Sequence, residues 1–453
     1  MIVMKFGGSS LADASRLRHV ADIVKTQLDK KPVLVLSAMG DTTDHLLTAG
    51  NLALNEGKVE FSQIEKLHLT TLNNLKLPDG RQNPVQIEVI NLLDELRRLL
   101  SGISLIKELS PRTKDYLVSF GERLCVRIVT AYLKSTGLNA FAFDAWEIGF
   151  LSNSNNTHAE LSKDSWNLIP DKVKPLIKKN VIPVVTGFLA KDENGNITTL
   201  GRGGSDLSAT MIAAACKADE AQIWKDVDGI LSADPRIVKN PKPVQSITYD
   251  EAAELAYFGA QVLHPRAMLP CMKTGTPVII KNSYNVKAPG TKIEQAAAPK
   301  KTTKTEMIPV RTITSKHKVT LVDIVSTRMV GQHGFLEEVF SIFAKYNISI
   351  DMVATSEVSV SLTLDDCYDL GEVKKHLNKI ASVEIKTGKA IISIIGDVKR
   401  SSEILGWTFV VCQRIGVNVQ MVSLGASKVN ISFIVNDNEA AKVIRALHVD
   451  FFD

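Results

Sequence analysis

The chain has 453 residues, of which 45% are hydrophobic and 23% charged, so it can form several globular domains. The net charge of +5, from 54 basic and 49 acidic residues, is small and spread along the chain, which argues against nucleic acid as a partner and suits small anionic substrates. We find no apolar run of about 18 residues and no secretory leader, and therefore expect a soluble, intracellular protein or the mature form of an imported one, without membrane contact.

The first 290 or so residues alternate strand and helix signals, which predicts an α/β sheet with crossover helices. Short apolar runs predict buried strands at residues 2–6, 33–37, 182–186, 222–224 and 278–281. Apolar residues at three- and four-residue spacing predict helices at 16–28, 85–100, 115–134 and 205–215. Ser205 and Asp206 are good capping residues for the last of these helices. Residues 57–110 are helical and polar in pattern, as in an insertion beside the sheet.

A segment without periodicity at 285–305, rich in Lys, Pro, Ala and Thr, predicts a linker. Beyond it a β-α-β-β-α-β pattern of roughly 65 residues occurs twice, which predicts two ferredoxin-like domains. We therefore expect domains at 1–290, 309–388 and 389–453, with a linker at 291–308. An alternative is that the strand at 309–314 completes the sheet of the second repeat, so that the two repeats interleave.

Two glycine-rich turns in the first domain indicate anion binding. Lys5 precedes Gly7 and Gly8 where a strand ends, and Arg202 precedes Gly203 and Gly204 just before a predicted helix. Glycines let backbone N–H groups approach phosphate oxygens, and each turn carries one cation. Neither turn is a Walker A loop or a GxGxxG motif. The simpler interpretation, two unrelated tight turns, stays open.

Six stretches in order resemble the signatures of the aspartate kinases in the amino-acid-kinase superfamily. They are KFGGSS at 5–10, LVSFGE at 117–122, TTLGRGGSD at 198–206, KDVDGI at 225–230, ADPR at 233–236 and FGAQVLHP at 258–265. The resemblance covers essentially the whole chain and is closest to the monofunctional, lysine-sensitive enzymes of plants. It implies a mainly parallel sheet sandwiched by helices, followed by two ACT domains.

The resemblance also implies the activity, which is ATP-dependent phosphorylation of the L-aspartate side chain to 4-phospho-L-aspartate. This is the first step of lysine, threonine and methionine biosynthesis, with feedback inhibition by lysine. Expected partners are L-aspartate, ATP and lysine, with Mg²⁺ delivered on ATP and no metal ligated by protein side chains. We expect a homodimer formed through the ACT domains, with a tetramer as the alternative, in the cytoplasm or the plastid stroma.

The resemblance, together with the charges of the substrates, implies roles for the matching residues. A substrate carboxylate with a pKa near ~4 is already ionised, so the site must supply positive charge and orientation rather than a base. Lys5 is the expected phosphoryl cation, with Asp206 to orient it. Arg202 is expected to bind the substrate carboxylate and Glu122 the ammonium. The remaining expected contacts are Ser37, Thr43, Gly203 and Ser205 for aspartate, and Gly7, Gly8, Ser9, Lys225, Asp226, Leu231, Arg236 and Gln261 for the nucleotide.

Structural alternatives stay open for several of these residues. Glu122 could merely complement a helix dipole near a helix start, and Asp206 could be only a helix cap. His264 is more typical of a packed structural histidine than of a base. Asp228 and Asp234 are typical turn formers. Many bacterial relatives carry a lysine where Gln261 stands, and Lys225 could supply the missing cation.

The second half resembles the effector site of lysine-sensitive members. Asp351 and Glu357 suit ammonium groups, and Gly334 opens a helix whose N–H groups suit a carboxylate. The full expected set is Met329, Gly334, Phe335, Leu336, Asp351, Ser356 and Glu357. In the alternative, purely structural interpretation, Asp351 is a charged residue on an edge strand and Phe335 is a core residue. Two rival functions are a kinase for another amino acid and a non-catalytic amino-acid sensor on a kinase fold.

Overall fold

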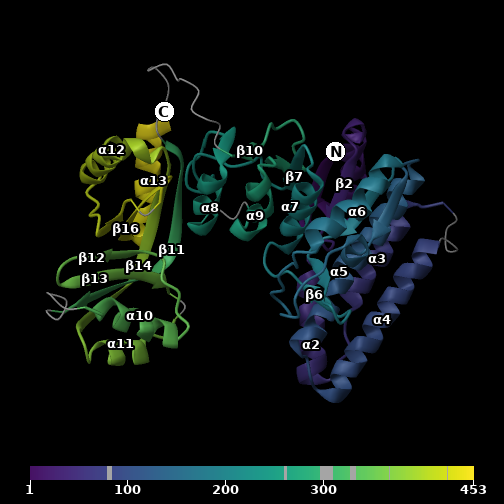
Figure 1. Cartoon of the computed structure of the whole chain (residues 1–453), viewed down its shortest axis with the longest axis horizontal. Helices are drawn as coiled ribbons and strands as arrows, with labels where there is room; N and C mark the ends of the chain where they lie inside the picture. Colours follow the sequence, from purple (N-terminus) through teal and green to yellow (C-terminus); the bar gives the residue numbers. More distant parts are fainter. Residues whose placement is uncertain are drawn as a thin grey trace. The chain divides into compact units, whose positions relative to one another are not determined.

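The computed structural model describes residues 1–78, 84–259, 263–295, 310–326, 333–366, 368–425 and 427–452. These residues form two compact units (Figure 1). Unit 1 comprises Met1–Ile230, Gln245–Tyr249 and Val262–Ala296, and unit 2 comprises Leu231–Val244, Asp250–Gln261 and Ala297–Asp453. Among the described residues, no helix is both long and apolar enough to cross a membrane.

Unit 1 is built on an eight-stranded sheet in the order β3-β4-β2-β1-β7-β9-β10-β8. Its strands are parallel except where β10 meets β9. The three central strands β1, β2 and β4 are buried along their whole length, because helices cover a parallel sheet on both faces. The strands are β1 (Ile2–Phe6), β2 (Pro32–Leu36), β3 (Ala140–Phe143), β4 (Ile182–Thr186), β7 (Glu220–Lys225), β8 (Ser246–Thr248), β9 (Val278–Asn282) and β10 (Thr291–Glu294).

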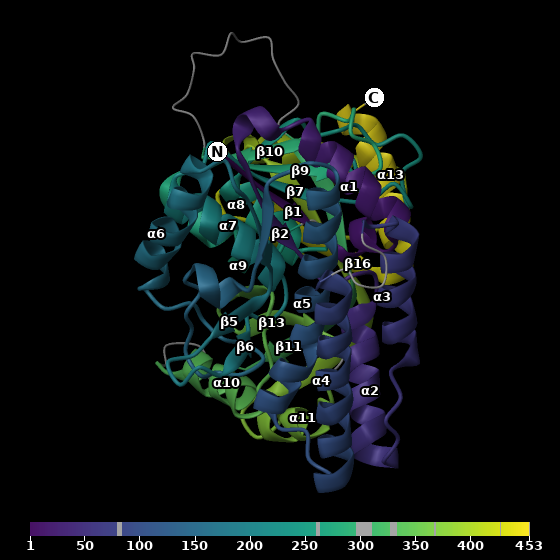
Figure 2. The same ribbon diagram turned by 90° about the vertical axis from the view of Figure 1, so that its right-hand side faces the viewer.

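The sheet lies between helices, as predicted. Helices α2 to α5 pack against one another (Figure 2), and α5 also contacts β2, β3 and β4, whereas α7 contacts β1, β2 and β7. A short hairpin of β5 (Leu189–Lys191) and β6 (Ile197–Thr199) leads into α7. The helices are α1 (Ala14–Lys25), α2 (Thr42–Glu56), α3 (Ser62–Leu75), α4 (Pro84–Ile106), α5 (Pro111–Ser135), α6 (Ser165–Lys178), α7 (Gly204–Cys216), α8 (Tyr249–Tyr257, which continues into unit 2) and α9 (Pro265–Thr274).

Unit 2 is built on a six-stranded antiparallel sheet in the order β12-β13-β11-β14-β16-β15. The two repeats seen in the sequence supply its two halves. The pattern of the first repeat predicts its second strand at 349–354, whereas β12 in the structure is Val353–Thr355. The elements are β11 (Val310–Val325), α10 (Phe335–Lys345), β12 (Val353–Thr355), β13 (Ser359–Asp365), α11 (Gly371–Leu377), β14 (Ser382–Gly396), α12 (Ser401–Arg414), β15 (Met421–Ser423), β16 (Asn430–Asn436) and α13 (Asp437–Phe452).

Two long strands, β11 and β14, run through both halves of this sheet. The first part of β11 pairs with the last part of β14, with Thr312 opposite Ile395. The second part of β11 pairs with the first part of β14, with Val325 opposite Ser382. A strand that precedes the first repeat therefore joins the sheet of the second repeat.

Unit 2 also contains two segments that precede residue 290 in the chain. Ser232 Oγ lies 2.8 Å from Nε2 of the buried His448 on α13, and Thr312 Oγ1 donates to the Leu231 carbonyl at 2.8 Å. On the second segment, Glu254 accepts a hydrogen bond from Asn430 Nδ2 at 2.9 Å. Segments 231–244 and 250–259 are thus held by side-chain contacts to the sheet and helices of unit 2.

Candidate active site

A polar cavity lies at the carboxyl ends of the parallel strands in unit 1. β1, β2 and β7 are adjacent in register, with Lys5 opposite both Val35 and Ile223, so the residues that end these strands share one edge. The cavity has a volume of about 360 Å³. It is lined by Lys5, Gly8, Ser37, Ala38, Gly40, Thr43, Glu122, Phe188, Gly201, Arg202, Gly203, Gly204, Ser205 and Asp206.

Lys5 and Asp206 form a buried ion pair at this edge. Lys5 Nζ lies 2.7 Å from Asp206 Oδ1, and Lys225 Nζ lies 3.6 Å from Oδ2 of the same carboxylate. Burial opposes the charged form of Asp206, but the two ammonium groups outweigh burial and hold its pKa below the ordinary value. Burial lowers the pKa of Lys225, helped by the Lys5 charge and opposed by Asp206. Two cations therefore share one ionised carboxylate.

Asp206 does not cap α7, so that alternative, and the expected capping role of Ser205 and Asp206, are wrong. The helix begins at Gly204, and its N-cap is Gly203 with φ +73°. Asp206 lies in the first turn and directs its carboxylate to Lys5 instead. A side chain on Gly203 would lie 2.7 Å from the His264 Cβ, so the turn requires glycine for space as well as for its left-handed backbone.

Glu122 lies in the middle of α5, not in its first turn, so it cannot serve as a helix-dipole partner there. Its Oε1 accepts a hydrogen bond from the Ala38 N–H at 3.2 Å, and its Oε2 has no hydrogen-bond partner among the described residues. Burial raises the pKa of Glu122 to about 8, although the Ala38 N–H and the Lys5 charge act in the opposite direction. The cavity wall therefore contains a buried carboxyl group, one oxygen of which has no hydrogen-bond partner among the described residues.

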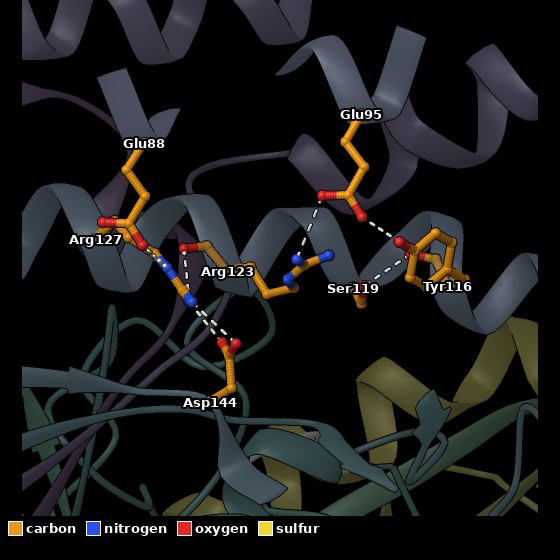
Figure 3. A network of polar contacts seen from close by, with 7 residues as sticks. All are labelled: Glu88, Glu95, Tyr116, Ser119, Arg123, Arg127 and Asp144. Atoms are coloured by element: carbon orange, nitrogen blue, oxygen red, sulfur yellow. Dashed lines mark hydrogen bonds and ion pairs between the residues drawn. The ribbon is translucent and has the colours of Figure 1, made fainter. Parts of the chain in front are cut away.

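A network of charged side chains holds α5, the helix that carries Glu122 (Figure 3). Arg127 donates to both oxygens of Asp144 and, at 2.9 Å, to Glu88 on α4. One turn earlier, Arg123 pairs with Glu95 of α4 at 3.6 Å. Because these contacts lie on both sides of the helix, α5 is fixed relative to α4 and to the segment after β3.

Arg202 is exposed at the mouth of the cavity. It forms no hydrogen bond or ion pair with another residue that the structure describes. Ser37 and Thr43 line the cavity from the segment after β2 and from the first turn of α2, and Ser205 lines it from α7. A guanidinium, a buried carboxyl group and several hydroxyls thus surround one space, which is the donor and acceptor set that a zwitterionic amino acid requires.

The Gly7–Gly8 turn leads from β1 into a short 3₁₀ helix, Gly8–Leu11. A Cβ on Gly8 would lie 2.6 Å from the Gly40 carbonyl oxygen, so the turn closes tightly against that loop. A Cβ on Gly7 would have only Lys5 Nζ nearby, at 3.6 Å, so the Gly7 backbone is accessible beside a cation. The exposed Ser9 follows, and its carbonyl accepts a hydrogen bond from Tyr284 at 3.0 Å.

The other expected nucleotide residues are more scattered. Asp226 is exposed directly after β7, whereas Leu231 and Arg236 belong to unit 2, where Arg236 pairs with Asp234 at 2.6 Å. Gln261 and the expected effector residue Met329 lie outside the described residues. No group of three or more His, Cys, Asp or Glu side chains suited to a metal ion occurs in the described ranges.

Five residues of the cavity wall were not among the contacts expected from the sequence: Ala38, Gly40, Phe188, Gly201 and Gly204. Phe188 has φ +67°, a conformation that is unusual for a bulky residue and typical of functional sites. The available signal was the position of Phe188 two residues after the buried strand β4, at the same edge as Lys5. The backbone conformation itself cannot be read from the residue type.

The expected effector residues occupy the first half of unit 2. Asp351 accepts a hydrogen bond from Tyr257 at 2.8 Å and pairs with Lys316 Nζ at 2.8 Å, so its carboxylate is already beside an ammonium. Gly334, with φ +90°, is the N-cap of α10, and Phe335 packs in the core of this half. Leu336 and Glu357 are exposed, and Ser356 Oγ lies 2.7 Å from Ser359 Oγ.

Comparisons with known proteins show the family of both parts of the chain. Residues 1–282 match the amino acid kinase family, and residues 322–379 and 392–451 match an ACT domain. Aspartokinase 1, chloroplastic, of Arabidopsis thaliana is 48% identical over 462 residues, which cover 100% of this chain and 80% of the relative. Lysine-sensitive aspartokinase 3 of Escherichia coli (strain K12) is 32% identical over 469 residues, covering 100% and 99%.

Two solved structures are similar along the whole chain. The structure of E. coli aspartokinase III in complex with lysine and aspartate (T-state) has a TM-score of 0.81 and 32% identity, and covers 100% of both chains. The structure of the same enzyme in complex with aspartate and ADP (R-state) has a TM-score of 0.80 and 30% identity, again with full coverage of both. The chain belongs to the amino acid kinase family and, within it, to the aspartokinases.

Proposed function

We propose that this protein transfers the γ-phosphoryl group of ATP to the side-chain carboxylate of L-aspartate, giving 4-phospho-L-aspartate and ADP. The observation that carries the proposal is the cavity in which Lys5, Glu122, Arg202 and Asp206 meet from distant parts of the chain. The E. coli relative whose structure contains aspartate and ADP supports the same pair of ligands.

The charges of the cavity fit an anionic phosphoryl donor. Lys5, Lys225 and Arg202 are cations, whereas Asp206 is ionised and Glu122, with a pKa of about 8, is mostly protonated at pH 7. The two cations that line the cavity, Lys5 and Arg202, together with Lys225 beside Asp206, therefore outnumber one negative charge before any ligand binds. Mg²⁺ bound with ATP would offset further phosphate charge.

In the proposed mechanism, a side-chain oxygen of aspartate attacks the γ-phosphorus, the bond from that phosphorus to the bridging oxygen breaks, and ADP leaves. No base is required, because the attacking carboxylate is already ionised. Lys5, oriented by Asp206, stabilises the charge on the transferring group, and the backbone at Gly7 and Gly8 contacts the phosphates. Asp226, which follows β7 directly in unit 1, is a further proposed nucleotide contact.

In this proposal the site recognises aspartate through both its α-carboxylate and its α-ammonium group. Arg202 binds the α-carboxylate in a two-point contact, which its planar guanidinium favours. The free Oε2 of Glu122 accepts the ammonium, and Ser37, Thr43 and Ser205 donate or accept hydrogen bonds around the substrate. This pairing gives the buried carboxyl group the partner that its Oε2 lacks among the described residues.

We further propose that lysine inhibits the enzyme by binding unit 2 near Gly334, Asp351, Ser356 and Glu357. The support is that Lys316 already places an ammonium against Asp351, and that the E. coli relative is named lysine-sensitive. We propose a homodimer formed through the ACT domains, located in the cytoplasm or, since the Arabidopsis relatives are named chloroplastic, in the plastid stroma.

The test is ADP release by the purified protein with ATP, Mg²⁺ and either aspartate or glutamate, with and without lysine. Aspartate-dependent release that millimolar lysine suppresses is the expected result. Release with another acid alone would assign a different amino-acid kinase, and the absence of release with any acid would assign a non-catalytic sensor. Light scattering of the same sample measures the subunit number.

A further inference from the structure

Asp115 is a buried carboxylate of α5 that lies outside the cavity and that the proposed mechanism does not use. It is 1% exposed. Its oxygens accept hydrogen bonds from the Thr157 N–H (2.9 and 3.1 Å), from Asn156 Nδ2 (2.9 Å) and from Thr199 Oγ1 (2.6 Å). One side chain therefore binds both the loop at residues 156–157 and the end of β6.

These two segments flank the glycine-rich turn that contains Arg202. Thr199 is the last residue of β6, and Arg202 follows three positions later. In between, Gly201 has φ +73°, and a Cβ there would lie 2.9 Å from His158 Nδ1 and 3.3 Å from the Thr157 carbonyl oxygen. The loop that Asp115 binds is thus packed directly against the residue that precedes Arg202.

The same helix carries Glu122, seven positions after Asp115. Two helical turns separate them, about 10 Å along the axis. Glu122 is therefore tied to Asp115 by the rigid helix, and the Arg202 turn is tied to Asp115 by Thr199 and Thr157.

We propose that Asp115 is a positioning residue that sets the spacing between Arg202 and Glu122 and thereby selects an amino acid of the size of aspartate. The inference rests on the proposed function, because it takes these two groups as the ones that bind the α-carboxylate and the ammonium. Asp115 itself touches no substrate. Its effect is on where the guanidinium lies relative to the buried carboxyl group.

A second contact allows this role to be tested without loss of the fold. Arg266, on α9, donates from Nη1 to the Leu200 carbonyl at 2.9 Å and from Nη2 to the Ala159 carbonyl at 2.7 Å. The Ala159 N–H also donates to the Thr199 carbonyl at 2.9 Å. When Asp115 loses its hydrogen bonds, these contacts still hold the base of the turn, so the turn loosens while the surrounding strands remain paired.

The experiment compares Asp115→Asn, Thr199→Val and Thr199→Ser with the wild type. Asp115→Asn turns an NH₂ group toward one of the donors, and Thr199→Val removes the hydroxyl while keeping the shape of the side chain. Both should raise KM for aspartate by roughly tenfold or more, change KM for ATP by less than about twofold, and reduce the preference for aspartate over glutamate in kcat/KM. Thr199→Ser restores the hydroxyl and should rescue the aspartate KM.

In the double variant Asp115→Asn/Thr199→Val, the rise in KM for aspartate should be smaller than the product of the two single rises. The reason is that both single variants disrupt the same hydrogen bond between Thr199 and Asp115. Equal changes in both KM values, or an unchanged preference for aspartate over glutamate, would overturn the positioning role. Where Asp115→Asn fails to fold, the two Thr199 variants carry the test. The affinity for aspartate is measured in parallel by calorimetry. If the wild type neither binds nor phosphorylates aspartate, the proposed function itself is refuted. If the wild type and Thr199→Val bind aspartate equally tightly, only the positioning role is refuted.

Discussion

The burial of Glu122 makes aspartate binding depend on pH in a way that can be calculated. Burial raises the pKa of this carboxyl group from 4.5 to about 8. At pH 7 only about one tenth of the free protein therefore carries the charged carboxylate. If the ammonium of aspartate needs that carboxylate, binding at pH 7 must first remove a proton, which costs about 1.4 kcal/mol.

The expected magnitude follows from this protonation equilibrium. The Kd for aspartate should fall about tenfold for each pH unit between pH 6 and pH 7.5 and level off above pH 8. The side chain of free aspartate stays ionised over this range and does not contribute. Calorimetry at pH 7 in buffers with different ionisation enthalpies should detect release of about 0.9 protons for each aspartate bound.

The variant Glu122→Gln separates this group from the other titrating residues. It has no ionisable proton, so its aspartate affinity should be independent of pH and weaker than that of wild type at pH 8 by about 2–5 kcal/mol. Glu65→Gln, which changes a half-exposed carboxylate on α3, is the matched control and should behave as wild type. A Kd that stays constant from pH 6 to pH 8 without proton release would refute the assignment of Glu122 as the ammonium partner.

Four other changes test separate parts of the mechanism and the fold. Lys5→Met should lower kcat by a factor equivalent to about 3–4 kcal/mol while the protein stays folded, since Lys225 still neutralises Asp206; a loss of less than about tenfold would exclude Lys5 as the phosphoryl cation. Arg202→Ala should raise KM for aspartate much more than KM for ATP, and equal effects in steady-state kinetics would place Arg202 on the phosphates instead. Asp351→Ala should weaken lysine inhibition in dose–response curves of ADP release, and unchanged inhibition would contradict the effector site. Burial lowers the pKa of His68 from 6.5 to about 4, so the folded wild type binds fewer protons than the unfolded chain and loses roughly 2–3 kcal/mol of stability from this group as the pH falls from 6.5 to 4.5. In urea unfolding His68→Leu should lack that loss, and an equal pH dependence of stability in both proteins would refute this role of His68.

Local sequence patterns predicted the elements of this protein well. The buried strands at 2–6 and 182–186 match the structure residue for residue, because continuous apolar runs flanked by turn residues reflect local chemistry. The duplicated β-α-β-β-α-β pattern predicted the two halves of unit 2 for the same reason. The glycine-rich turns at Lys5 and Arg202 were likewise visible, since glycine at a strand-to-helix turn reports a local backbone requirement.

Tertiary structure alone decided how these pieces interact. A capping residue and a charged partner have the same sequence signature, and only the parallel pairing of β1 with β7 brings Lys5 and Lys225 to the carboxylate of Asp206. The pKa of Glu122 depends on burial among residues more than eighty positions away, which no local pattern encodes. Asp115 gave no signal in the sequence at all, because its meaning lies in three donors that only the folded chain places around one carboxylate.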